Sequence, residues 1–158
     1  MAEAVPVRDH EREIERLALL FADACCRVDR NDFASLWTTD SKSGVAIWEV
    51  DPPHGFTRTG SPDELGAMFA SGLSRWAGFL QLVHGTIATV NGTAATARTY
   101  VSELGQPPGV SGEGYRNVGI YLDDLADTAN GWRYVRRRYH YLYLDRAPLP
   151  GEFRRPPS

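Results

Sequence analysis

The sequence predicts an α+β fold in which a curved sheet wraps around a long N-terminal helix. Apolar residues recur at steps of three and four over residues 14–28, which is the spacing of one buried helical stripe. Strand-like stretches follow over residues 80–144, with Asn91-Gly92 as a strong hairpin turn. Helices at the start of a chain followed by a run of strands are typical of α+β domains.

Each element has its own local signal. Asp9 or His10 is expected to begin the long helix, and Asp32 is expected to cap a short second helix through Trp37. Ser61-Pro62-Asp63-Glu64 predicts a third helix start, because a cap residue precedes proline and two carboxylates. The strands are expected at residues 45–50, 56–59, 80–90, 93–104, 115–125 and 132–144. The apolar stripe of the long helix must be buried against a large surface, and the concave face of this mixed, largely antiparallel sheet is the one available. Helices and sheet should therefore enclose a cone-shaped barrel with one open end.

Length and composition indicate one globular domain. The 158 residues suit a single domain over 1–158, with loose tails expected at 1–9 and 148–158. Apolar residues make up 42% and charged residues 23%, and the net charge of −3 argues against a nucleic-acid partner. No apolar segment approaches the roughly 20 residues of a membrane span, so no membrane partner is expected. Adjacent Cys25 and Cys26, without a signal peptide, indicate reduced thiols and a cytoplasmic location.

Two carboxylates lie where the first helix ends and the second begins. Asp29 could point into a cavity or cap the second helix; we expect the cavity, because Asp32 stands directly before Phe33 as the better cap. Across the sheet, His84 should share a strand face with Leu82, Thr86 and Ala88. A pocket beside His84 would be lined by small neighbours.

Four stretches in this order resemble the SnoaL-like branch of the nuclear-transport-factor-2-like superfamily. They are residues 28–37, Gly60 with the capped helix after it, residues 83–86 leading to Asn91-Gly92, and residues 130–133 leading to an arginine run. The resemblance covers about residues 12–143. It implies a cone fold and is nearest to scytalone dehydratase, bile-acid dehydratase and hexachlorocyclohexane dehydrochlorinase.

The resemblance also implies site residues. Those enzymes place an aspartate after the first helix and a histidine on the strand before the hairpin, which Asp29 and His84 match. The dehydrochlorinase has an arginine on the last strand, and Arg137 is the best match, with Arg136 and Arg138 as alternatives in register.

The tyrosine that the dehydratases carry near the aspartate is missing. Ala24, Cys25, Cys26 and Val28 occupy that part of the helix. Tyr100, Tyr115 and Tyr121 on the sheet are the alternatives for such an acid.

These residues predict a cofactor-independent lyase that eliminates water or HX from a hydrophobic cyclic substrate. His84 would act as the base, Asp29 would orient it, and Arg137 would stabilise a developing anion. A cyclase or isomerase with the same base is the first alternative, and a non-catalytic ligand-binding or assembly module is the second. The pocket walls are expected to include Trp37, Trp48, Phe69, Tyr100, Tyr121 and Tyr139.

The remaining polar residues are expected to be structural or solvated. His10, His54 and His140 are scattered, so no metal site is predicted. Asp123 and Asp124 are interpreted as surface charges at a strand end, and residues 105–114 as a mobile lid. The apolar convex face predicts a homodimer or homotrimer.

Overall fold

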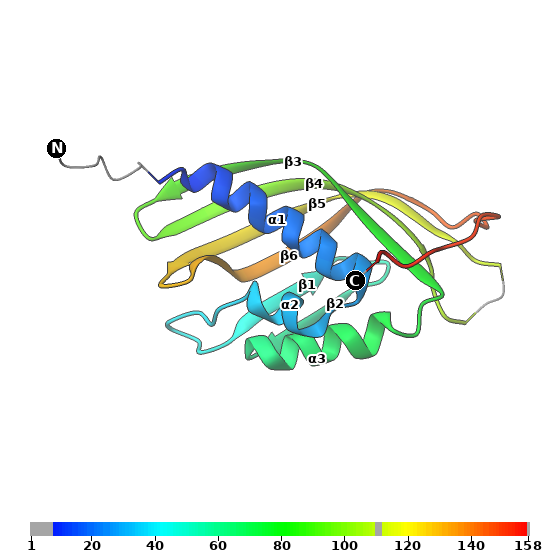
Figure 1. The fold of residues 1–158 in the computed structure, drawn as a ribbon, viewed down its shortest axis with the longest axis horizontal. Helices are drawn as coiled ribbons and strands as arrows, with labels where there is room; N and C mark the ends of the chain where they lie inside the picture. Colours follow the sequence, from blue (N-terminus) through cyan, green and yellow to red (C-terminus); the bar gives the residue numbers. More distant parts are fainter. Residues whose placement is uncertain (1–7, 110–111, 158) are drawn as a thin grey trace.

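The computed structural model describes residues 8–109 and 112–157 and confirms the α+β cone. Six strands form one curved, unclosed sheet in the order β2-β1-β6-β5-β4-β3. Figure 1 shows α1 crossing the hollow of the sheet, with α2 and α3 beside β1 and β2. Residues 110 and 111 of the expected lid, and residues 1–7 and 158 of the expected tails, lie outside the described residues.

Three helices form in the predicted places, although α2 begins before the expected cap residue Asp32. They are α1 (His10–Arg27), α2 (Arg30–Ser35) and α3 (Pro62–Leu73). Asp9 caps α1 by accepting from the Arg12 backbone N–H, and Ser61 and Glu64 form a reciprocal capping box on α3. The predicted stripe of α1 is buried, and Phe21 at its centre is fully enclosed. The helix therefore provides one wall of the core.

The strands alternate between an inner face and an outer face. They are β1 (Ala46–Val50), β2 (Phe56–Gly60), β3 (Gly78–Asn91), β4 (Ala94–Gln106), β5 (Tyr115–Thr128) and β6 (Gly131–Asp145). Neighbours pair antiparallel except β1 and β6, which run parallel, so the sheet is mixed as predicted. Register shifts interrupt β3 between Val83 and Gly85 and the β5–β6 pairing at two places. Each shift changes which residues face inward.

A buried ion pair lies in the centre of the core, and it corrects one expectation. Asp123 was expected on the surface with Asp124, but only Asp124 is exposed. Asp123 faces inward and accepts two hydrogen bonds from Arg137, at 2.9 and 3.1 Å. Both side chains are 1% exposed. The guanidinium carbon of Arg137 also lies about 4 Å from the ring centres of three aromatic residues, which are Phe21, Tyr121 and Tyr134.

The ends of the described chain make specific contacts where loose tails were expected. Arg8 forms ion pairs with Glu13 and Asp127. The Phe153 ring packs on Gly78 so closely that a Cβ there would overlap it. Among the described helices, none combines the length and apolarity of a membrane span.

Removing the carboxylate of Asp123 should be strongly destabilising. In Asp123→Ala the buried charge of Arg137 loses its counter-ion, so the free energy of unfolding should fall by about 3–5 kcal/mol. Urea unfolding followed by tryptophan fluorescence measures this. Asp63→Ala, which removes the exposed partner of Arg30, is the matched control and should change stability little. Equal losses in both variants would contradict the assignment.

Candidate functional site

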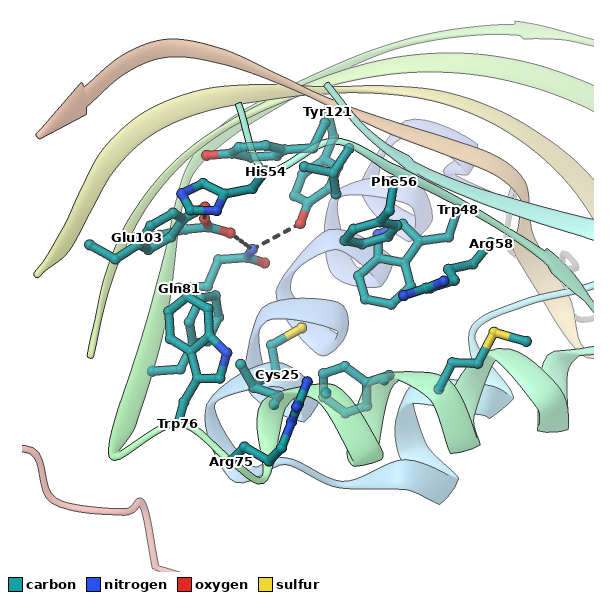
Figure 2. Close-up of a pocket in the computed structure, with 18 of the residues that line it drawn as sticks. Cys25, Trp48, His54, Phe56, Arg58, Arg75, Trp76, Gln81, Glu103 and Tyr121 are labelled. Carbon is teal, nitrogen blue, oxygen red and sulfur yellow. Dashed lines mark hydrogen bonds between the residues drawn. The ribbon is translucent and has the colours of Figure 1, made fainter. Parts of the chain in front are cut away.

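A pocket opens at the end of the cone between α3, β1, β2 and the strands β3 to β6. Its cavity volume is about 320 Å³, within the range of small-molecule sites. Figure 2 shows aromatic rings around the cavity and polar side chains gathered on one wall. The aromatic wall residues are Trp48, Phe56, Phe69, Trp76, Phe79, Tyr115, Tyr121, Tyr139 and Tyr141.

The carboxyl group of Glu103 lies at the polar wall. Glu103 comes from β4, is 5% exposed, and faces inward with Val101 by strand alternation. Its Oε1 accepts from the side-chain amide of Gln81 at 2.6 Å. Its Oε2 accepts from the Tyr115 hydroxyl and the Asn117 amide, both at 3.0 Å. Since a carboxylate has about four acceptor positions, these three bonds leave Oε1 able to accept one more.

Burial shifts the pKa of Glu103. Desolvation raises the pKa of this carboxyl above its ordinary value, and the neighbouring side chains of Asn117, Gln81, Tyr115 and Tyr139 oppose the shift only in part. A buried carboxyl group with a raised pKa is a candidate for the general acid or base of a site.

Gln81 and Tyr121 place a free hydroxyl donor beside Glu103. The amide nitrogen of Gln81 donates to Glu103 and, at 3.1 Å, to the hydroxyl oxygen of Tyr121. Figure 2 draws both bonds. Within the described part of the chain, Tyr121 is only an acceptor in this network, so its own proton is available to a ligand oxygen.

A second line of hydroxyls leads from Glu103 toward the mouth. Tyr115 is hydrogen-bonded to Glu103 and, at 2.9 Å, to the hydroxyl of Tyr141. His54, which was expected to be simply solvated, is exposed but lines the mouth with its ring 5.4 Å from that of Tyr115. Partial burial of the ring lowers the pKa of the His54 imidazole, which favours its neutral form.

Four of the six residues expected on the pocket wall are found there. They are Trp48, Phe69, Tyr121 and Tyr139. Trp37 instead packs in the core behind the pocket, against Phe21 and Phe33. Tyr100 lies on the outer face of β4 and is 38% exposed, because inward positions on this strand are odd-numbered.

Asp29 caps α2 and does not line the pocket. Val28 ends α1 in the left-handed conformation, with φ of 54°, and Asp29 then accepts from the backbone N–H of Asp32 at 2.8 Å. A 2.9 Å ion pair with Arg27 occupies the other oxygen. The Asp32 N–H is the main cause of the lowered pKa of Asp29. The cavity position expected for Asp29, and the capping role expected for Asp32, are therefore both wrong.

His84 lies on the outer face of the sheet. In the pairing of β3 with β4, Val83 opposes Val101 and Gly85 opposes Tyr100, so His84 is the extra residue of a bulge. Its Nε2 lies 2.9 Å from the Ser102 hydroxyl, and the side chain is exposed. Uninterrupted alternation would have turned His84 inward, but the bulge turns Gln81 inward instead. The structure does not bring Asp29 and His84 together.

Arg137 faces the interior, whereas its two alternatives do not. Arg136 and Arg138 are exposed on the outer face of the sheet, where they pair with Glu49 and Asp51. Arg137 lies behind Tyr121, held by Asp123, and is not part of the pocket wall. Its predicted role as an anion stabiliser stays a prediction.

The sequence contained a signal for Glu103 that the site prediction missed. The alternating positions Ala95, Ala97, Thr99 and Val101 predict an inward face for β4, and Glu103 continues that face. A charged residue at the end of an apolar strand face is a candidate functional group. Gln81 had no comparable signal, because the bulge is not visible in the sequence.

No metal-binding cluster is found among residues 8–109 and 112–157. Groups of three or more histidine, cysteine or carboxylate side chains close enough to share an ion do not occur there.

Comparison with solved structures identifies the fold as that of the nuclear-transport-factor-2-like proteins. A protein from Kribbella flavida superimposes with a TM-score of 0.75 at 18% identity, over 86% of this chain and 93% of that one. The hexachlorocyclohexane dehydrochlorinase LinA-type3 from Novosphingobium barchaimii gives a TM-score of 0.70 at 19% identity, covering 92% and 94% of the two chains. An NTF2-like protein with a cystatin-like fold from Novosphingobium aromaticivorans gives 0.65 at 22% identity, covering 84% and 82%.

The sequence comparison names the family. The model of the SnoaL-like domain matches residues 7–138, so the chain belongs to the SnoaL-like family, as the resemblance predicted. Comparison with curated proteins gives no match.

The raised pKa of Glu103 predicts how stability depends on pH. The folded state holds this proton to a higher pH than the unfolded chain, so the contribution to stability is full below the unfolded pKa of 4.5 and is lost as pH rises through the folded value. Glu103→Gln has no proton to lose in this range. As pH rises from acidic to mildly alkaline, the melting temperature of the variant should therefore fall less than that of wild type. Parallel curves for wild type and variant would show that Glu103 titrates normally.

The capping geometry predicts a structural effect at Asp29. Asp29→Ala removes the acceptor for the Asp32 N–H and should lower the free energy of unfolding by about 1 kcal/mol. Asp29→Asn retains a capping oxygen and should cost less. Chemical denaturation of the two variants gives the comparison; a larger loss in Asp29→Asn would point to a requirement for the charge instead.

Proposed function

We propose that this protein is a small-molecule lyase that binds a hydrophobic cyclic substrate in the cone pocket and uses Glu103 as its general base. The single observation that carries the proposal is the buried carboxyl group of Glu103 on the pocket wall, with one acceptor position left on Oε1. Family membership supports a small-molecule site in this cone. One relative in fold is named as a dehydrochlorinase of hexachlorocyclohexane, an elimination on a ring compound.

The proposed reaction begins with removal of a proton from carbon. Tyr121 donates its hydroxyl hydrogen to a carbonyl oxygen of the substrate, which makes the adjacent C–H acidic. Glu103 takes that proton on Oε1, and the electron pair of the C–H bond forms an enolate. The enolate then expels a hydroxyl group from the next carbon, which leaves as water with the proton that Glu103 returns.

In this proposal Glu103 takes the role of base that was predicted for His84. The outward position of His84 and the capping bonds of Asp29 leave both side chains off the pocket wall. A base must come within about 3 Å of the proton it removes, and Glu103 is better placed for a ligand in this cavity. A cyclase or an isomerase would use the same first step, so these remain the alternatives within the proposal.

Substitution of Glu103 tests the proposal. Purified protein is incubated with a panel of cyclic β-hydroxyketones, whose dehydration is followed by the ultraviolet absorbance of the conjugated product. Glu103→Gln should lose about 10²–10⁴-fold in kcat, and Tyr121→Phe should lose less because it removes one hydrogen bond. His84→Ala and Asp29→Asn serve as matched controls and should retain turnover.

The outcomes separate the rival functions. Turnover that survives in Glu103→Gln but disappears in His84→Ala would return the base role to the histidine. Ligands that bind equally to all variants without conversion would identify the protein as a carrier or binding module.

A further inference from the structure

The mouth of the pocket carries positive charge. Arg58 from β2 and Arg75 just after α3 both line the cavity. Figure 2 shows their guanidinium groups approaching the opening from two different sides. The Arg58 guanidinium lies over the Phe56 ring, 5.2 Å from its centre, so an aromatic wall residue helps to hold it at the rim.

These two charges have no counter-ion within the described part of the chain. The ion pairs formed there involve other arginines, at positions 8, 27, 30, 116, 136, 137, 138 and 146. The one carboxylate residue on the pocket wall is Glu103, and its oxygens are bonded to Gln81, Tyr115 and Asn117. Arg58 and Arg75 are therefore free to pair with a ligand.

The middle of the cavity is apolar. Trp48, Phe69 and Leu73 line it, and Met68 lies near the opening with 39% exposure. The pocket thus presents an acid–base group and a hydroxyl donor on one wall, an aromatic middle, and two cations at the mouth. A site for a purely hydrophobic ligand would not need two cations at its mouth.

We propose that the substrate is an amphiphilic cyclic carboxylic acid whose carboxylate pairs with Arg58 and Arg75 while its ring enters the aromatic part of the pocket. This inference rests on the proposed function, because it names the substrate class of the same site. Guanidinium groups match the planar oxygens of a carboxylate and can bind them in a bidentate manner.

The position of the two arginines also sets the direction in which the ligand binds. They attract an anion to the mouth, whereas the wall at Glu103 carries no cation to hold one. The neutral end of the ligand, with its carbonyl and hydroxyl groups, is directed toward Glu103 and Tyr121. Arg58 and Arg75 are positioning residues in this scheme, since they contact the substrate far from the reacting bond.

Matched ligand pairs test the proposal. Cyclohexanecarboxylate, benzoate and naphthoate are each compared with the corresponding neutral amide by isothermal titration calorimetry at low ionic strength. Wild type should bind the carboxylate about tenfold more tightly than the amide, as expected for two exposed charge pairs. The double variant Arg58→Gln/Arg75→Gln should bind both members about equally, whereas Arg16→Gln, on the exposed face of α1, should keep the preference.

The contrary results are distinct. Equal binding of acid and amide by wild type, or a preference that survives in the double variant, overturns the inference. If the inference fails but turnover of neutral ring compounds still depends on Glu103, the proposed function stands and only the carboxylate substrate class is withdrawn. If no member of any pair binds to wild type, the inference and the proposed ligand pocket both fall.

Discussion

The buried pair of Arg137 and Asp123 is the interaction on which the interior of the cone depends. Removing two charges from water costs several kcal/mol each, and only good geometry with a close partner offsets that cost. Here Asp123 on β5 accepts two hydrogen bonds from Arg137, and Phe21 on α1 covers one side of the guanidinium. One cation on β6 thus links the N-terminal helix α1 to the last two strands of the sheet.

The pocket is built outward from this centre. Tyr121 contacts Arg137 with its ring and Gln81 with its hydroxyl, and Gln81 in turn bonds to Glu103. A continuous series of contacts therefore runs from the core pair to the proposed base. The position of Glu103 is set by the same packing that stabilises the fold, which gives a rigid support for acid–base chemistry.

Most of the fold could be predicted from local patterns, whereas much of the site could not. The stripe of α1, the capping box at Ser61 and the hairpin at Asn91-Gly92 each depend on neighbouring residues alone, and each was correctly read. The side on which His84 lies depends on one bulge, and nothing in the local sequence marks it. Resemblance placed the histidine on the correct strand but could not place it on the correct face.

The aspartates show the same limit. Asp29 could cap α2 or point into the cavity. The left-handed conformation of Val28 decides between them, because it sets the direction of the chain after α1. Asp123 looked like a surface residue because Asp124 follows it, yet alternation allows only one of two neighbours to face inward. Its inward position became clear only with the partner Arg137, which lies across the β5–β6 pairing.

The hydroxyls of Tyr115 and Tyr141 link the charge of Glu103 to what a ligand meets at the mouth. A phenol hydroxyl has one hydrogen to donate. While Glu103 is ionised, Tyr115 therefore donates its hydrogen bond to that carboxylate. Tyr141 then donates to Tyr115 and can offer a ligand only its lone pairs. A proton taken up on Oε1 leaves Oε2 as an acceptor, so Tyr115 still donates to Glu103 and Tyr141 still donates to Tyr115. The mouth therefore offers the same oxygen lone pairs to substrate, enolate and product, and a ligand that bonds to Tyr141 must supply the hydrogen itself.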